Sequence, residues 1–305
     1  MNIAIIGVGG VGGYFGGKIS RLVDNKNINV YFIARGKHLE EIKKNGLKLK
    51  TSDMGEFICK PTLATDNICD LPNLDVCFIC VKEYDLNKVL DQLKDKISEN
   101  TQIIPLLNGV DIYKRIRKII KNGVVFPACV YVGTHIEKPG VVIQNGGSCT
   151  IIFGEDPKNR NSDPSAICEI MKVGEINFKW TERNIEEIWS KFMFIAAYGL
   201  VTAAEDKTLG EVFENKELSQ KVLGIMNEIF EISKAENVQL EDDIVERSYR
   251  KADNFSYDTK TSFQRDYEIE GKPNEKEIFG QAIIDLGTIH NISTPITKSI
   301  YLKLE

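Results

Sequence analysis

Residues 1–20 read MNIAIIGVGGVGGYFGGKIS, and the glycines of this stretch decide how the chain begins its fold. The apolar run at residues 3–6 predicts a buried strand. Gly7, Gly9 and Gly12 follow in the pattern G-x-G-x-x-G and open a segment with the pattern of a helix. Because glycine loses more backbone entropy on folding than any other residue, such a density of glycine indicates a geometric requirement.

A strand, this glycine pattern and a helix, in that order, form the setting in which the pattern binds a dinucleotide. Gly7 is expected to make the tight turn, Gly9 to let the backbone approach a pyrophosphate, and Gly12 to let the helix pack on the strand. The helix N-terminus adds N–H groups and the positive end of its dipole. The alternative is a glycine-rich turn that binds no ligand. The predicted cofactor-binding residues of this loop are Gly7, Val8, Gly9, Gly10, Val11 and Gly12.

The end of the second predicted strand indicates which dinucleotide is bound. Residues 30–36 read VYFIARG, with Arg35 at the tip of the strand and no acidic residue there. An acidic residue at this place accepts a hydrogen bond from the ribose 2′-hydroxyl of NAD, whereas an arginine accommodates the 2′-phosphate of NADP. The sequence therefore predicts NADP(H) as the cofactor. The alternative role for Arg35 is stacking on the adenine ring.

The order of predicted elements gives the fold class. Short apolar runs alternate with helical patterns up to about residue 180, which predicts an α/β fold with a Rossmann-type dinucleotide-binding domain. Residues 46–61 predict a hairpin, and the apolar runs between residues 124 and 155 are expected to extend the sheet. Helical periodicity continues after Trp180. We therefore expect a nucleotide-binding domain at residues 1–180 and an all-helical domain at residues 181–305.

Composition bears on the classes of partner. The net charge of −5 argues against nucleic-acid binding. Apolar runs fall short of the roughly 18 residues of a membrane span, and the N-terminus lacks the basic start of a signal peptide. The seven cysteines, an odd number in a long chain, favour a reducing compartment. We expect a cytoplasmic protein that binds a small molecule, without nucleic acid, membrane or metal; its apolar helical part is compatible with a homodimer.

A bound nicotinamide transfers hydride and needs a group that gives a proton to the developing alkoxide. Lys82 and Asn108 each follow a predicted strand, at the edge of the sheet where α/β folds bind ligands. Lys191 is the only charged residue between Glu187 and Glu205. It either extends to solvent or is desolvated, and desolvation would make it a better proton donor.

These residues belong to an ordered set of motifs that resembles the ketopantoate reductase (2-dehydropantoate 2-reductase) family over nearly the whole chain. The resemblance implies NADPH-dependent reduction of 2-dehydropantoate, a 2-oxo acid, to (R)-pantoate in pantothenate and coenzyme A biosynthesis. The motifs are the glycines at 7–12, AR at 34–35, GLKL at 46–49, VK at 81–82, NG at 108–109, GVV at 140–142, W-x-K at 189–191, TSFQRD at 261–266, GKPNE at 271–275 and TP at 294–295.

The resemblance also implies roles for individual residues. Lys191 corresponds to the proton donor, Asn108 to an asparagine that contacts nicotinamide ribose and substrate, and Lys82 to a lysine beside both. Ser262 corresponds to a serine that helps to hold the substrate carboxylate.

Two further positions are implied to contact the cofactor. Ile136 matches a backbone contact, and Glu275 matches an acidic residue near cofactor and substrate. The spacing around Glu275 differs by one residue on each side from the family pattern, so Glu277 is the alternative carboxylate.

The chain departs from the family beside Lys191. Family members carry asparagines four and eight residues after the lysine, on the same helix face, where this chain has Ile195 and Gly199. Either Thr202 or Tyr198 supplies the missing polar groups, or the substrate is a different, less polar 2-oxo acid. A protein that only senses NADPH is the non-catalytic alternative, and Lys191 favours an enzyme over it.

Overall fold

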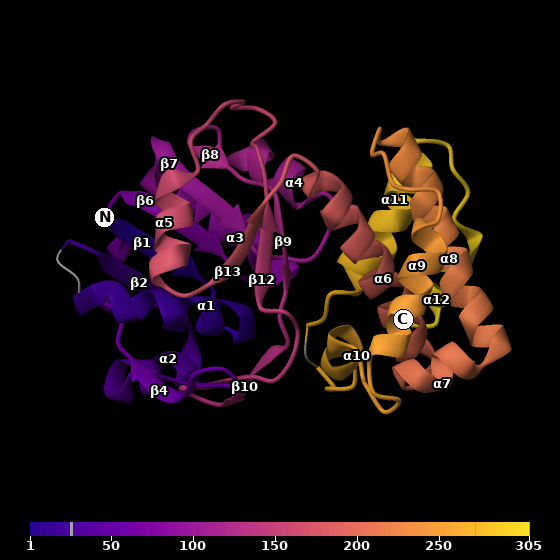
Figure 1. Ribbon diagram of the computed structural model, residues 1–305, viewed down its shortest axis with the longest axis horizontal. Coiled ribbons are helices and arrows are strands. Elements are labelled where there is room, and N and C mark those ends of the chain that lie inside the picture. Colours follow the sequence, from indigo (N-terminus) through magenta and orange to yellow (C-terminus); the bar gives the residue numbers. More distant parts are fainter. Residues whose placement is uncertain (25–26, 272, 305) are drawn as a thin grey trace. The chain divides into compact units, whose positions relative to one another are not determined.

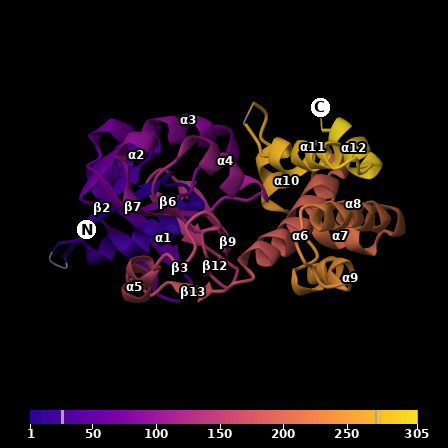
Figure 2. The ribbon, with the colours of Figure 1, turned by 90° about the horizontal axis from the view of Figure 1, so that it is seen from above.

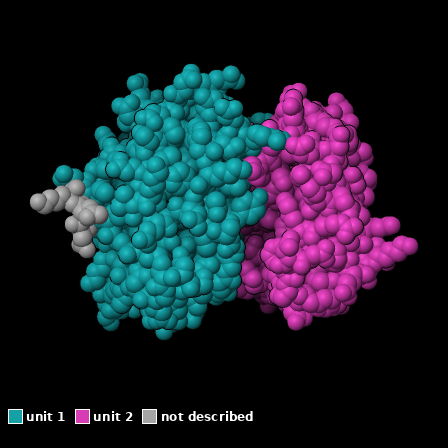
Figure 3. Space-filling model, in the orientation of Figure 1, with its two compact units in different colours: residues 1–107, 111–184 teal, residues 108–110, 185–305 magenta. Residues whose placement is uncertain are grey.

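The computed structural model describes residues 1–24, 27–271 and 273–304, so Lys272 of the GKPNE motif lies outside the described residues. The chain forms two compact units (Figure 3). Unit 1 consists of residues 1–107 and 111–184, and unit 2 consists of residues 108–110 and 185–305.

A six-stranded parallel sheet forms the centre of unit 1 (Figure 1). Its strands, in spatial order, are β5 (Leu63–Thr65), β2 (Asn29–Ile33), β1 (Asn2–Ile6), β6 (Leu74–Ile79), β7 (Ile97–Pro105) and β8 (Val124–Val125). Numbered along the chain, this order is 3-2-1-4-5-6, that of dinucleotide-binding Rossmann folds. The connecting helices are α1 (Gly10–Ser20), α2 (Gly36–Asn45), α3 (Glu83–Leu93) and α4 (Ile112–Ile119). The predicted α/β fold class is confirmed.

Two smaller sheets complete unit 1. One has the order β10-β11-β3-β4, with β10 Thr134–Lys138, β11 Val141–Gln144, β3 Leu47–Thr51 and β4 Gly55–Cys59. The other has the order β13-β12-β9, with β13 Asn177–Trp180, β12 Thr150–Phe153 and β9 Ala128–Tyr131. Strands β3 and β4 pair antiparallel, which confirms the hairpin expected at residues 46–61.

The expectation that the apolar runs between residues 124 and 155 extend the main sheet is wrong except for β8. After β8 the Phe126 N–H still donates to the Ile103 carbonyl at 2.9 Å, and the next residue, Pro127, has no N–H to donate. The chain then pairs β9 with β12, and β11 with β3 of the hairpin. Helix α5 (Ser165–Val173) was not anticipated from the sequence.

Helix α1 packs unusually close to the strands around it. A Cβ added at Gly12 would lie 2.1 Å from the Gly7 carbonyl oxygen, and one added at Gly16 would lie 3.0 Å from a side-chain carbon of Ile5. Gly7 itself has a φ of +95°, a left-handed conformation that favours glycine. Glycine at these positions therefore determines the spacing between α1 and β1.

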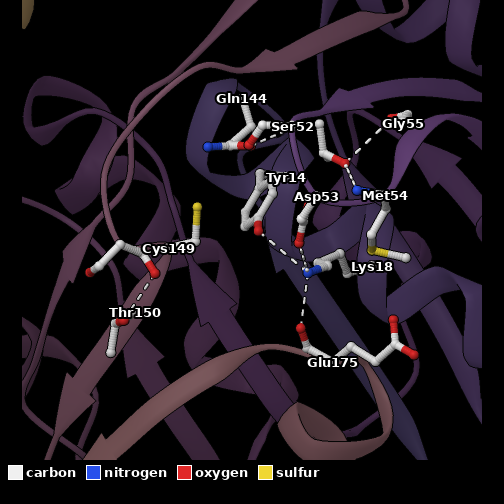
Figure 4. A network of polar contacts seen from close by, with 12 residues as sticks. Tyr14, Lys18, Ser52, Asp53, Met54, Gly55, Gln144, Cys149, Thr150 and Glu175 are labelled. Atoms are coloured by element: carbon white, nitrogen blue, oxygen red, sulfur yellow. Dashed lines mark hydrogen bonds and ion pairs between the residues drawn. The ribbon is translucent and has the colours of Figure 1, made fainter.

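A polar network holds the opposite end of α1 (Figure 4). Lys18 is only 3% exposed and donates hydrogen bonds to the Glu175 carbonyl (2.9 Å), Asp53 Oδ2 (3.3 Å) and the Tyr14 hydroxyl (3.4 Å). Asp53 belongs to the turn between β3 and β4, and Glu175 precedes β13. The buried charge is thereby paired, and it joins α1 to both small sheets.

Helices are the only regular secondary structure among the described residues of unit 2, in agreement with the predicted fold class. Its helices are α6 (Asn184–Glu205), α7 (Leu209–Glu214), α8 (Lys216–Ala235), α9 (Ile244–Arg250), α10 (Ser262–Tyr267), the π-helix η5 (Glu277–Gln281), α11 (Ala282–Ile289) and α12 (Pro295–Leu302). Short 3-10 turns in the chain are η1 (Arg21–Asp24), η2 (Ile68–Asp70), η3 (Lys94–Lys96) and η4 (Lys251–Asn254).

Helices α11 and α12 pack beside α8 (Figure 2). Glu228 of α8 accepts hydrogen bonds from the backbone N–H groups of Ile296 (2.8 Å) and Thr297 (2.9 Å), which lie in the first turn of α12. The carboxylate thus satisfies donors that the helix itself cannot. None of the helices in the described part of the chain is long and apolar enough to span a membrane.

The spacing of α1 predicts different effects for two glycine variants. A Gly12→Ala substitution places a methyl group 2.1 Å from a backbone oxygen and should destabilise unit 1 by about 2 kcal/mol. At Gly9 nothing lies within 4 Å of an added Cβ, so Gly9→Ala should leave stability nearly unchanged. Thermal unfolding followed by circular dichroism measures both. Equal melting temperatures for the two variants would contradict the close packing inferred here.

Candidate functional site

The glycine loop leaves open space in front of helix α1. The N–H groups of Gly7 and Val8 both donate to the carbonyl of Ile33 at 3.0 Å, which fixes the loop beside the end of β2. Gly9 is the N-cap residue of α1, and no side chain caps the helix there. With no described atom within 4 Å of a Cβ at Gly9, the loop can accommodate a pyrophosphate close to its backbone. The residues present therefore fit a dinucleotide.

Thr134 adds a polar group beside this loop that the sequence did not indicate. A Cβ at Gly10 would lie 3.0 Å from the Thr134 hydroxyl oxygen and 2.8 Å from its carbonyl oxygen. Among the described residues, that buried hydroxyl has no hydrogen-bond partner. Thr134 opens β10, two residues before Ile136, whose side chain is exposed and whose backbone pairs with Val142.

Arg35 lies at the tip of β2, as predicted, and forms a two-point ion pair. Its Nη2 lies 2.8 Å from Asp85 Oδ2, and its Nη1 donates to Asp85 Oδ1 at 3.3 Å. The Arg35 side chain is 75% exposed. Asp85 occupies the first turn of α3, and sequence reasoning missed it because the two residues are 50 positions apart.

His38, close behind Arg35 in the sequence, contributes no charge to this corner of the sheet. Its Nδ1 accepts a hydrogen bond from the Gly140 N–H at 3.1 Å. Burial lowers the pKa of the His38 imidazole, so the ring is neutral at pH 7.

Lys82 follows β6 and precedes α3, at the carboxyl edge of the parallel sheet. The preceding residue, Val81, is tightly packed against the glycine loop, since a Cβ at Gly7 would lie 2.8 Å from the Val81 nitrogen. This contact brings the end of β6 to the first glycine of the loop. Lys82 thus follows directly on a segment that touches the predicted cofactor-binding backbone.

Within unit 2, Lys191 and Asn108 are brought together although they are 83 residues apart. The Lys191 ammonium in α6 donates a hydrogen bond of 2.8 Å to the Asn108 side-chain oxygen. Lys191 is half-buried, and it is the only charged residue between Glu187 and Glu205 of α6. The amide oxygen holds the ammonium in a fixed orientation, and an ammonium has three N–H donors in all. This pair has the composition of a proton-donating site.

The two positions that depart from the family pattern offer no polar group. A Cβ at Gly199 would lie 3.6 Å from the Phe263 side chain, and Ile195 is an aliphatic residue. The buried Thr202 hydroxyl lies 3.2 Å from the Gly199 carbonyl and 3.1 Å from the Thr261 hydroxyl.

Tyr198, the other residue considered as a replacement, is also engaged. Its hydroxyl donates to the Tyr249 carbonyl at 2.9 Å, and its side chain is fully buried. The hydroxyls of Thr202 and Tyr198 thus both serve contacts inside unit 2.

The structure distinguishes the two candidate carboxylates near the C-terminus. Glu275 is only 4% exposed and lies just before the π-helix η5. Glu277 is exposed, and its carboxylate accepts a hydrogen bond from the Tyr301 hydroxyl at 2.8 Å. Burial thus distinguishes Glu275 from Glu277, which is the first residue of the π-helix itself.

Ser262 is exposed and begins α10, directly after the cap residue Thr261. Two residues further on, Gln264 is 1% exposed, and neither atom of its side-chain amide has a partner among the described residues. Sequence reasoning missed Gln264, because one amide in a six-residue helix gives no local signal.

Comparison with known proteins agrees with this geometry. The family profile described as "Ketopantoate reductase PanE/ApbA" matches residues 3–158, and that described as "Ketopantoate reductase PanE/ApbA C terminal" matches residues 184–305. The uncharacterized oxidoreductase YkpB of Bacillus subtilis (strain 168) is 26% identical over 305 residues, covering 100% of this chain and 98% of that protein.

Solved structures share the fold. The 2-dehydropantoate 2-reductase of Porphyromonas gingivalis W83 has a TM-score of 0.84 at 27% identity, covering 100% of this chain and 99% of that one. A D-mandelate dehydrogenase in a ternary structure with NADH and anilino(oxo)acetate has a TM-score of 0.85 at 19% identity, covering 100% of this chain and 97% of that one. Because the two profiles match both the α/β part and the helical part, this chain is an oxidoreductase that belongs to the ketopantoate reductase family.

Proposed function

We propose that this enzyme uses NADPH to reduce a 2-oxo acid to the 2-hydroxy acid, with 2-dehydropantoate, which would give (R)-pantoate, as the leading substrate. Residues 1–180 would bind the nucleotide and residues 181–305 would bind the acid. The observation that carries the proposal is the hydrogen bond between Lys191 and Asn108, which gives a family oxidoreductase an oriented proton donor.

The cofactor would be held mainly by the backbone of residues 7–12, where the open space at Gly9 faces the N-terminus of α1. Arg35 would bind the 2′-phosphate, and the remaining predicted contacts would come from Lys82, Asn108, Ile136 and Glu275. When bound, the reduced nicotinamide supplies the hydride for the carbonyl carbon.

Lys191 would act on the carbonyl oxygen of the acid. An N–H of its ammonium would stabilise the negative charge that develops on that oxygen and would then transfer the proton to it. Asn108 keeps the ammonium in place by accepting one of its hydrogen bonds. The exposed Ser262 hydroxyl would help to hold the substrate carboxylate. Lys82 is proposed as a further substrate-binding residue.

A second candidate substrate is a 2-oxo acid with an apolar side chain. Ile195 and Gly199 have no side-chain group that could form a hydrogen bond with a hydroxyl on the substrate. The hydroxyls of Thr202 and Tyr198 already make contacts within unit 2. The neighbour D-mandelate dehydrogenase, named for an acid with an apolar ring, supports such a substrate. A polar group buried without a partner costs about 1–3 kcal/mol, which would disfavour hydroxylated acids.

Loss of the Lys191 ammonium should remove turnover but leave the cofactor bound. Lys191→Met is expected to lower kcat by about 100-fold or more, the usual contribution of a proton donor. The dissociation constant of NADPH, measured by the fluorescence of the nucleotide, should stay within about twofold of the wild-type value, because Lys191 is not among the proposed cofactor contacts. Lys216→Met, at the exposed first residue of α8, is the matched control and should behave as wild type. Full activity of Lys191→Met would rule out the proposed proton donor.

The substrate side chain can be tested with two acids that differ by one hydroxyl. If no residue binds the hydroxyl of 2-dehydropantoate, 3,3-dimethyl-2-oxobutanoate should have the higher kcat/KM, by about 5- to 150-fold, because a buried hydroxyl without a partner costs about 1–3 kcal/mol. Ile195→Asn should shift the preference toward 2-dehydropantoate. A wild-type preference of more than about fiftyfold for the hydroxylated acid would show that another residue binds the hydroxyl.

The choice of cofactor should depend on Arg35. Arg35→Ala is expected to weaken NADPH binding about tenfold and to leave NADH binding nearly unchanged, because only NADPH carries the 2′-phosphate. Fluorescence titration with both nucleotides measures the ratio of the two dissociation constants. Lys43→Ala, in the last turn of α2, removes a positive charge from the same helix and serves as the control. If Arg35→Ala left the ratio of the two dissociation constants unchanged, Arg35 would not be the residue that binds the 2′-phosphate.

A further inference from the structure

We propose that Asp85 is a determinant of cofactor specificity, which reduces the preference for NADPH over NADH by competing with the 2′-phosphate for Arg35. The inference rests on the proposed role of Arg35 and adds a second residue that opposes it. Asp85 would therefore be a specificity-determining residue and not a catalytic one.

The geometry of the pair carries this inference. Arg35 Nη2 and Nη1 face Asp85 Oδ2 at 2.8 Å and Oδ1 at 3.3 Å, so the carboxylate takes two adjacent N–H directions of the guanidinium. A phosphate bound by arginine uses the same two-point arrangement. Carboxylate and phosphate therefore compete for one set of donors.

The position of Asp85 at the start of α3 fixes its carboxylate beside Arg35. It lies in the first turn of α3, an 11-residue helix whose positive end favours an anion there. Its backbone N–H donates to the Lys82 carbonyl at 3.1 Å, which fixes the start of the turn. The other acidic residue of this turn, Glu83, is paired with Arg115. Asp85 is thus the acidic residue of this turn that faces Arg35.

Because the Arg35 side chain is exposed, another anion can replace Asp85 as its partner. An ion pair with one partner 75% exposed contributes about 1 kcal/mol or less, so an incoming dianionic phosphate can displace the carboxylate. Binding of the 2′-phosphate would therefore cost the energy of the Arg35–Asp85 ion pair. NADPH would consequently lose part of the advantage that Arg35 gives it, whereas NADH, which has no 2′-phosphate, would not.

Dissociation constants of NADPH and NADH test the proposal in wild type, Asp85→Asn, Arg35→Ala and the double variant. Asp85→Asn should raise the ratio of the NADH constant to the NADPH constant about two- to fivefold. In the Arg35→Ala background the same substitution should change this ratio by less than about 1.5-fold, because the shared donors are gone. Raising the salt concentration should reduce the first effect.

Two controls exclude general effects of charge and folding. Asp91→Asn removes the same charge from the exposed last turn of α3, where Asp91 pairs with Lys94, and should leave the ratio unchanged. Asp85→Glu keeps the carboxylate and should stay near wild type. Thermal unfolding of each variant shows that it is folded.

The outcomes separate this inference from the proposed cofactor choice. If Arg35→Ala removes the NADPH preference but Asp85→Asn leaves the ratio unchanged, competition by Asp85 is overturned and the role of Arg35 stands. If Asp85→Asn has its full effect without Arg35, direct repulsion replaces competition, and the proposal is also overturned. If Arg35→Ala changes nothing, the proposed cofactor choice itself fails.

Discussion

The close approach of helix α1 to strand β1 is the constraint on which unit 1 depends. No side chain fits at Gly12, because even a Cβ would lie 2.1 Å from the carbonyl oxygen of Gly7. This contact aims the N-terminus of α1 at the space beside Gly9, where nothing lies within 4 Å of a Cβ position. The same backbone approach therefore builds both the core of the unit and the place where a pyrophosphate fits.

The side chains proposed to act in binding and catalysis are held by partners of opposite or complementary character. The guanidinium of Arg35 is held by Asp85, and the ammonium of Lys191 by the amide oxygen of Asn108. The two pairs differ in what they do to the charge. Asn108 is neutral and orients Lys191 without neutralising it, whereas Asp85 cancels the charge of Arg35. A neutral partner suits the proton donation proposed for Lys191, and a charged partner suits the adjustable phosphate binding proposed for Arg35.

Local sequence patterns were sufficient for the elements whose signals are local. The strand–glycine–helix start and the hairpin at residues 46–61 were predicted because turn residues and apolar periodicity specify them. The apolar runs between residues 124 and 155 predicted strands, but such runs do not determine which strand pairs with which. Pro127 diverts the chain from the main sheet, so β9 and β11 join two other sheets. Sheet membership was therefore the part of the fold that sequence reasoning could not supply.

The candidate site shows the same division between local and distant information. Lys191 and Arg35 were singled out because each is unusual among its neighbours, but Asp85 lies 50 residues from Arg35 and gives no signal of its own.

The residues around Lys191 show why substrate identity is harder to infer than reaction type. A proton donor is defined by one ammonium and its orienting partner, both of which the motifs mark. Recognition of a substrate side chain depends on which polar groups near Lys191 still lack partners. In this chain Thr202 bonds to Thr261 and Tyr198 to Tyr249, contacts that only the folded helices create. Because these hydroxyls stabilise the packing of unit 2, turning either toward a substrate would cost an internal hydrogen bond. Neither hydroxyl can therefore bind a polar group of a substrate without giving up a contact inside unit 2.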